Sequence, residues 1–140
     1  GIIEAPLGRS PTQRVKMAVV QGGRYSRTHY WVEERASAPL PASLVLCRLE
    51  TGRTHQVRAH FVAIGHPLVG DERYCPADLL AKARKALPGL GRPWLHATRL
   101  GFAHPVSGEW LRFRSALPPD LERPLTVLGL GLGLRGPDER

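Results

Sequence analysis

Residues 50–60, ETGRTHQVRAH, hold the densest group of side chains in this chain that could take part in polar chemistry. The segment contains two arginines, two histidines and a glutamine, and an apolar run, FVAIG, follows it directly. If the apolar run is helical, the polar residues lie at a helix N-terminus, where free backbone N–H groups and a partial positive charge favour an anion. Cationic side chains at that end disfavour the helix slightly, so we expect a negative group to lie nearby.

The anion that faces Arg53 and Arg58 has three candidate identities. A phosphate would make this segment an edge that binds RNA or a nucleotide. A carboxylate held against Arg58 would be kept in its ionised form by the neighbouring guanidinium. The purely structural alternative is an internal ion pair with Glu50 or Asp71, and the sequence pattern taken alone favours this last identity.

The histidines of the chain lack the spacing of a metal site. His55 and His60 are five residues apart, about 140° around a helix, whereas two ligands on one helical face are four residues apart. His66, His96 and His104 have no ligand spacing either, and two cysteines are too few for a structural zinc site. We therefore expect no metal site. We also expect His55 to be a hydrogen-bonding residue of this segment, and His60 to be either hydrogen-bonded or on the surface.

The periodicity of the residues after position 54 predicts the helix that carries this polar segment. Val57, Phe61 and Ile64 recur at i, i+4 and i+7, which is one helical face, and the sequence GHP that follows is a stop signal. Thr54 has the side chain of an N-cap residue. The sequence therefore predicts a helix over about residues 55–64, with its apolar face directed at the core.

The strands predicted on either side of this helix indicate how the segment is supported. Residues 13–20 and 27–35 are rich in β-branched and aromatic residues and are separated by two glycines, which predicts a hairpin. Residues 43–50, SLVLCRLE, are apolar enough for a central strand. Residues 95–105 and 109–118 predict a second hairpin around the turn PVSG.

Helical and terminal segments complete a mixed pattern. Residues 76–89, PADLLAKARKALPG, predict an amphipathic helix that begins near a proline and stops at Pro-Gly. Because strands adjacent in sequence are joined by short turns, the chain favours an α+β fold, a mixed and largely antiparallel sheet flanked by helices. We expect the folded portion to span residues 1–123. The Leu/Gly-rich tail, residues 124–140, should be poorly ordered, because glycine is entropically costly in a strand.

Net charge is the strongest global property of this 140-residue chain, which is one domain in size. Its net charge is +8, and 17 of its 20 basic residues are arginine, whose planar guanidinium suits bidentate contact with phosphate. This composition indicates a polyanionic partner, RNA or DNA before acidic membrane, although coding bias would explain it nearly as well.

Hydropathy and cysteine content bear on location. No segment approaches the roughly 20 apolar residues that cross a bilayer, and the first residues do not resemble a signal peptide. With two cysteines and no disulfide framework, we expect a reducing, cytoplasmic location, with an organelle left open.

Residues 49–74, LETGRTHQVRAHFVAIGHPLVGDERY, strongly resemble the signature of the RluA-like pseudouridine synthases, which act on large-subunit ribosomal RNA and some tRNAs. Residues 2–34 and 94–121 are similar to neighbouring family segments in the expected order, so the likeness covers nearly all of residues 2–121. The resemblance implies an RNA-modifying isomerase. Such an enzyme flips a uridine out of the RNA, detaches the uracil, rotates it and rejoins it through C5.

Arg58 is the residue to which the resemblance gives a catalytic role. In the family an arginine at the matching position pairs with the aspartate that attacks the substrate, and neither a metal nor a cofactor is required. The guanidinium would hold that aspartate ionised and oriented. Arg53, Thr54, His55 and Gln56 would then lie at the rim that faces the RNA, where phosphate contacts offset the cost of base flipping.

The family's nucleophile is the residue that this chain does not match. It lies in a His-Arg-Leu-Asp segment, followed by a tyrosine that packs on the target base, and neither segment occurs here. Glu50, in the similar CRLE, belongs to the strand that leads into TGRTHQ, and Asp71 matches a different, structural family position. We therefore expect the C-terminal part of a catalytic domain, inactive alone, with the missing N-terminal half as its partner. Two alternatives are a non-catalytic RNA-binding module and a remnant that does not fold independently.

Overall fold

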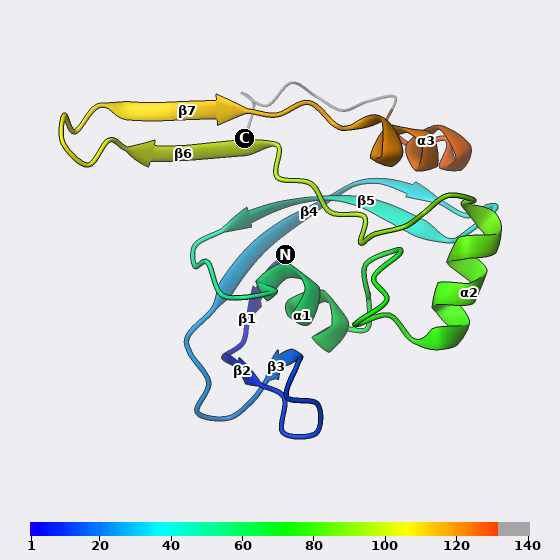
Figure 1. Ribbon diagram of the computed structural model, residues 1–140, viewed down its shortest axis with the longest axis horizontal. Helices are drawn as coiled ribbons and strands as arrows, with labels where there is room; N and C mark the ends of the chain where they lie inside the picture. Colours follow the sequence, from blue (N-terminus) through cyan, green and yellow to red (C-terminus); the bar gives the residue numbers. More distant parts are fainter. Residues whose placement is uncertain (132–140) are drawn as a thin grey trace.

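The computed structural model describes residues 1–131, which form an α+β fold built on antiparallel strands (Figure 1). One sheet has three strands in the order β1-β4-β5, namely Ile2–Glu4 (β1), Arg27–Ala36 (β4) and Ala42–Leu49 (β5). Two further antiparallel pairs are Leu7–Arg9 (β2) with Met17–Val19 (β3), and Arg99–Ala103 (β6) with Trp110–Arg114 (β7).

Three helices flank these strands within the described residues: Gln56–Ala63 (α1), Ala77–Ala86 (α2) and Pro119–Leu128 (α3). None of the helices found in residues 1–131 has the length and apolar character needed to span a membrane. The combination of antiparallel strands and flanking helices confirms the predicted fold class. The predicted amphipathic helix and the predicted C-terminal hairpin are confirmed as α2 and β6–β7.

The strand that contains Met17 pairs with β2 and not with β4, so the hairpin predicted across the two glycines is wrong. β1 already occupies the edge of β4. The chain then turns so that the buried Leu7 lies opposite Val19 and forms a bridge to Arg24. The strand composition was recognisable, but this pairing depends on three-residue strands that are too short to give a periodic signal.

β5 is an edge strand of the described sheet, although its apolar sequence predicted a central one. It gains burial from helices, since Ala42 and Leu44 pack against a cluster contributed largely by α2 and α3. An apolar edge strand covered by helices has the same composition as a central strand, so the pattern alone does not separate the two.

The larger hydrophobic core lies where α2 and α3 meet the adjoining ends of β4 and β5 (Figure 1). Its buried members are Ala83, Leu87, Leu90, Leu125, Leu128 and Leu130. Three of these lie beyond residue 123, so the predicted boundary between domain and tail falls inside α3 and is wrong. Leu121, Leu125 and Leu128 recur at helical spacing. The alternation of Leu and Gly directly after them makes that spacing hard to recognise in the sequence. The rest of the predicted tail, residues 132–140, lies outside the described residues.

α1 packs on the three-stranded sheet through a face that is partly polar. The rings of Phe61 and Tyr30 meet edge-on, with 5.5 Å between their centroids. Val57 is only half-buried and Ile64 is exposed, so the predicted apolar face is wrong apart from Phe61. The interface is instead completed by His60, which has no exposed surface.

His60 is fully hydrogen-bonded, the first of the two states predicted for it. Its Nε2 donates to the Ala5 carbonyl at 3.0 Å, and its Nδ1 accepts from the Thr28 hydroxyl at 2.9 Å. The same hydroxyl accepts a hydrogen bond from Gln56 Nε2 at 3.0 Å. A continuous polar chain therefore joins α1 to β4 and to the segment after β1.

Replacing His60 with alanine should destabilise the fold, because the Thr28 hydroxyl and the Ala5 carbonyl would lose their partner in a buried site. We expect His60→Ala to lower the free energy of unfolding by about 2–4 kcal/mol, measured by circular dichroism during thermal and urea unfolding of the 140-residue chain. His66→Ala, a change at an exposed histidine, is the matched control. Equal stability of the two variants would contradict this role of His60. A non-cooperative transition of the unmodified chain would support the alternative that the chain is a remnant that does not fold independently.

Candidate functional site

The polar segment enters α1 through a left-handed residue. His55 is the N-cap, with φ 53° and ψ 27°, a region in which residues other than glycine are uncommon. The predicted N-cap, Thr54, is therefore wrong by one residue. No side chain of the N-cap residue closes the helix end, so another group has to hold the loop.

Gln56 is the side chain that holds this loop. Its Oε1 accepts hydrogen bonds from the backbone N–H of Arg53 at 3.0 Å and from the Thr51 hydroxyl at 2.8 Å. Its Nε2 donates to the Arg27 carbonyl and to the Thr28 hydroxyl, each at 3.0 Å. Gln56 is 3% exposed and its amide is fully used. Gln56 therefore faces the sheet, and its side chain has no free donor or acceptor for the RNA contact that the sequence predicted.

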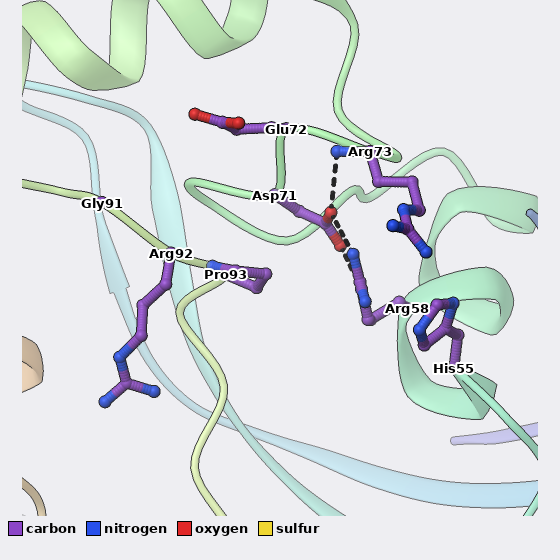
Figure 2. Close-up of a pocket in the computed structure, with 8 residues that line it drawn as sticks. All are labelled: His55, Arg58, Asp71, Glu72, Arg73, Gly91, Arg92 and Pro93. Carbon is purple, nitrogen blue, oxygen red and sulfur yellow. Dashed lines mark hydrogen bonds and ion pairs between the residues drawn. The ribbon is translucent and has the colours of Figure 1, made fainter. Parts of the chain in front are cut away.

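Arg58, in the first turn of α1, binds Asp71 through two hydrogen bonds. Its Nε and Nη2 donate to Oδ2 and Oδ1 of the carboxylate, each at 2.7 Å (Figure 2). The Asp71 side chain has no exposed surface, whereas 17% of the Arg58 side chain is exposed. The internal ion pair with Asp71 that the sequence pattern favoured is present. The other candidate, Glu50, pairs with His29 and Arg27.

Asp71 is held in turn by the backbone that follows it. The N–H group of Arg73 donates to Oδ1 at 3.2 Å (Figure 2). The N–H group of Tyr74 donates to the same oxygen at 3.3 Å. The N–H groups of Tyr74 and Cys75 donate to the Asp71 carbonyl oxygen at 3.2 and 2.8 Å. Every oxygen of this residue is therefore occupied by a fixed donor, as a buried carboxylate requires.

Tyr74 packs against the Arg58 guanidinium and links it to His55. The Cζ atom of Arg58 lies 4.8 Å from the centroid of the Tyr74 ring, a cation–π contact. The Tyr74 hydroxyl accepts from the Met17 N–H at 2.9 Å and lies 2.9 Å from His55 Nδ1. The hydroxyl therefore ties the ring to both β3 and the residue at the start of α1.

Two groups of the site have displaced pKa values. The hydrogen bonds to Asp71 raise the pKa of Arg58 above its ordinary value, so the guanidinium stays charged. Burial lowers the pKa of His55 below its ordinary value, and the charges of Arg58 and Arg73 lower it further. At neutral pH the site therefore presents a permanent cation beside a neutral imidazole.

These side chains open onto a shallow depression of about 340 Å³. The lining residues are His55, Arg58, Asp71, Glu72, Arg73, Gly91, Arg92 and Pro93. Figure 2 shows the Arg58–Asp71 pair between His55 and Arg73 on one side and Arg92 on the other.

Gly70 brings the two sides of the depression together. It has φ 77°, and a Cβ atom at this position would lie 2.5 Å from the Arg92 carbonyl oxygen. The neighbouring Val69 carbonyl accepts a hydrogen bond from the Trp94 N–H at 2.8 Å. Only glycine allows the turn before Asp71 to approach the opposite segment this closely.

The structure brings together two of the five predicted site residues, His55 and Arg58, at the depression. His55 forms a hydrogen bond within the site, as predicted. Arg53 lies outside the lining, where its Nε donates to the Tyr25 carbonyl at 3.2 Å, and Thr54 is exposed.

Sequence reasoning missed the contributions of Tyr74, Arg73 and Arg92. The run DERY directly after a glycine was recognisable as a polar turn. The sequence did not indicate that this turn lies close to α1.

What the site offers chemically is charge and hydrogen bonding. Within residues 1–131, no cluster of three or more His, Cys, Asp or Glu side chains is arranged to hold a metal ion. The Arg58 guanidinium has five N–H donors, of which Asp71 receives two. In the described part of the chain the other three have no hydrogen-bond partner, so the site can bind a further anion.

Comparison with known proteins shows that the chain is similar to RNA pseudouridine synthases. Residues 1–63 match the family model of RNA pseudouridylate synthase. The ribosomal large subunit pseudouridine synthase D of Nitrosomonas europaea is 46% identical over 121 residues, 86% of this chain and 34% of that protein. An uncharacterized RNA pseudouridine synthase of Chloroflexus aurantiacus is 45% identical over 122 residues, 87% of this chain and 35% of that protein. The chain thus spans about a third of the length of these relatives.

Two solved human structures are similar to this chain. RNA Pseudouridylate Synthase Domain Containing 1 aligns with a TM-score of 0.68 and 34% identity, over 86% of this chain and 50% of that one. RNA Pseudouridylate Synthase Domain Containing 4 aligns with a TM-score of 0.60 and 25% identity, over 94% of this chain and 57% of that one. The resemblance of residues 49–74 is thereby confirmed: this chain belongs to the family of RluA-like RNA pseudouridine synthases.

Proposed function

We propose that this chain is part of the catalytic domain of an enzyme that isomerises uridine to pseudouridine in RNA. The observation that carries the proposal is the Arg58 guanidinium, fixed by Asp71 in a depression with a basic rim. Ribosomal RNA is the first candidate substrate, supported by relatives named as ribosomal large subunit pseudouridine synthases, and tRNA is the second. A ribosomal substrate implies the cytoplasm, or an organelle that contains ribosomes.

Arg58 serves to bind the nucleophile of the reaction. The three guanidinium donors that Asp71 leaves free can hold a second carboxylate in charge-assisted hydrogen bonds. Such contacts keep the carboxylate ionised and orient it toward the target nucleotide. We propose that this carboxylate belongs to an aspartate supplied from outside these 140 residues.

The reaction exchanges one bond of the nucleotide for another. The bond between N1 and C1′ breaks, the detached uracil rotates, and a bond between C5 and C1′ forms. C5 loses its proton and N1 gains one, so no oxidant or reductant is needed. The contribution of this chain is to position the nucleophile and to hold the RNA with the uridine flipped out, which itself costs a few kcal/mol.

A basic surface beside the depression is the proposed RNA contact. It consists of Arg9, Arg14, Lys16 and Arg73, none of which forms an ion pair within residues 1–131. Arg9 Nη1 donates to the Arg14 carbonyl at 3.2 Å, and Lys16 Nζ lies 5.9 Å from the centroid of the Tyr74 ring. Cations that no acid neutralises favour the phosphate backbone of RNA.

Arg53, Thr54 and His55 remain proposed contacts at the RNA-facing rim. Thr54 is exposed, and Arg53 and His55 are half-buried, so each can reach a ligand. Together with the basic surface they would supply the phosphate contacts that base flipping requires.

A non-catalytic RNA-binding module would use the same basic surface. The environment of Arg58 favours the enzyme. An arginine that only attracts phosphate gains nothing from a buried acid, because the acid neutralises its charge. An arginine that has to orient one particular group benefits from the buried acid, because the acid fixes the direction in which the guanidinium points.

The hairpin β6–β7 is the surface through which we propose that this chain joins the rest of the catalytic domain. Figure 1 shows the hairpin set apart from the three-stranded sheet. Its large apolar residues are exposed: Leu100 by 59%, Phe102 by 39%, Trp110 by 59% and Phe113 by 52%. Isolated hairpins are marginally stable, and exposed apolar patches mark interaction sites. The chain spans only 34% of the Nitrosomonas europaea relative, and we propose the remaining catalytic domain as the partner.

The main experiment uses a hybrid enzyme in which this chain replaces the matching third of the Nitrosomonas europaea relative. We expect the hybrid to form pseudouridine in a large-subunit ribosomal RNA transcript, because it combines Arg58 with the proposed aspartate. Release of tritium from C5-labelled uridine measures the reaction. A hybrid that folds and binds RNA but releases no tritium would contradict the proposal. Release by the 140-residue chain alone would show that the nucleophile lies within it.

Removing the charge of Arg58 tests its role, provided that the buried acid is neutralised as well. Arg58→Ala alone would leave Asp71 buried without its partner, a destabilisation of about 3–5 kcal/mol. In the hybrid enzyme we expect the double variant Arg58→Met, Asp71→Asn to keep its melting temperature, to bind RNA within about threefold of the unmodified hybrid, and to lose at least about 100-fold in kcat. Arg35→Met, at an exposed arginine of β4, is the matched control. Proportional losses of binding and turnover would instead make Arg58 a phosphate contact.

The hairpin is tested by comparing the hybrid enzyme with the 140-residue chain. Trp110→Ser and Phe113→Ser should each destabilise the hybrid by about 3 kcal/mol, because these side chains become buried against the added domain. They should leave urea unfolding of the chain alone unchanged. Val127→Ser, at an exposed position of α3, is the control in both proteins. Unaltered stability of the hybrid would rule out the proposed interface.

A further inference from the structure

Asp71 is a buried anion whose presence stability alone does not explain. Removing an ion pair from water carries a desolvation penalty that its mutual attraction only partly compensates, and apolar side chains of similar volume are often equally stable. The local core is already apolar, with Leu7 and Ala59 buried beside Tyr74. The charged pair is therefore better explained by what it does to Arg58.

Asp71 fixes the direction in which Arg58 points. The carboxylate is bound on one side by the backbone of its own turn and on the other by the Nε–Nη2 edge of the guanidinium. Because a guanidinium is planar and rigid, two bonds to one edge determine where the remaining N–H groups are directed. Those remaining donors face the depression side of the pair, where Arg58 keeps its exposed surface.

Tyr74 limits the other movement left to the guanidinium. Its ring lies against Arg58, with 4.8 Å from Cζ to the ring centroid. The ring is itself held at its far end, where the hydroxyl binds the Met17 N–H and His55 Nδ1. Tilting Arg58 toward the ring would therefore require Tyr74 to leave both partners.

We propose that Asp71 and Tyr74 are positioning residues, which together hold the Arg58 guanidinium in one orientation with its free donors directed at the catalytic carboxylate. The inference rests on the proposed function and extends it by two residues that act through Arg58 without touching the substrate.

The role of Asp71 is testable because two effects of this residue on the second carboxylate have opposite signs. The negative charge of Asp71 repels another carboxylate and raises the pKa of that group. The hydrogen bonds of Asp71 keep Arg58 in place, which lowers the same pKa. Neutralising Asp71 therefore raises the pKa of the nucleophile if positioning dominates, and lowers it if charge dominates.

The experiment measures kcat, KM for RNA and the pH profile of kcat/KM for Asp71→Asn in the hybrid enzyme. We expect kcat to fall between about 10-fold and 100-fold, KM to change by less than about threefold, and the acid limb of the profile to move to higher pH. Asp78→Asn, the same change at an exposed acid of α2, should leave all three unaltered. A merely structural role would lower the melting temperature without moving the acid limb.

Tyr74→Phe provides a second variant, which decides the matter if Asp71→Asn does not fold. It keeps the ring against Arg58 and removes the hydroxyl that holds the ring. We expect a smaller loss of kcat, about 3-fold to 10-fold, with the acid limb displaced in the same direction. A folded Asp71→Asn or Tyr74→Phe hybrid with unchanged kcat and acid limb, or with the limb at lower pH, overturns the inference. An unmodified hybrid that forms no pseudouridine would instead refute the proposed function.

Discussion

The charge pair between Arg58 and Asp71 is the constraint on which the rest of the site depends. A carboxylate with no exposed surface needs fixed donors on every side, and here they come from α1 and from the turn after Gly70. The pair thereby joins α1 to the turn that contains Asp71, 13 residues further along the chain. The left-handed His55, the amide of Gln56 and the hydroxyl of Tyr74 all serve to keep the helical partner of this pair in place.

The elements that could be predicted from the sequence are those with local boundary signals. α2 lies between prolines, and β6–β7 surround a turn sequence, so their own residues define them. The failures share a physical cause, which is that the deciding contact lies far away in sequence. β3 pairs with β2 because β1 has taken the edge of β4. α3 continues past residue 123 because Leu125 and Leu128 meet α2, although the glycines that follow suggest disorder.

For the site, sequence reasoning identified Arg58 and offered Asp71 among its partners, but could not measure the distance between them. It also placed Gln56 at the surface and left His60 undecided. Periodicity rules assume that a polar side chain prefers water. That assumption fails where a polar chain of hydrogen bonds through Thr28 satisfies both residues inside the fold. The same buried hydrogen bonds explain why the apolar residues Val57 and Ile64 are left outside the interface.

Gly70 has a consequence for how proteins that share this fold can diversify. The gap between the Asp71 turn and the segment around Arg92 is set by contact of main chain with main chain. Exchanging Glu72, Arg73 or Arg92 would therefore alter the charge and shape of the walls while the gap itself stays constant. A lineage of such proteins can thus change the charge and shape of this depression by surface replacement alone, with its spacing inherited unchanged.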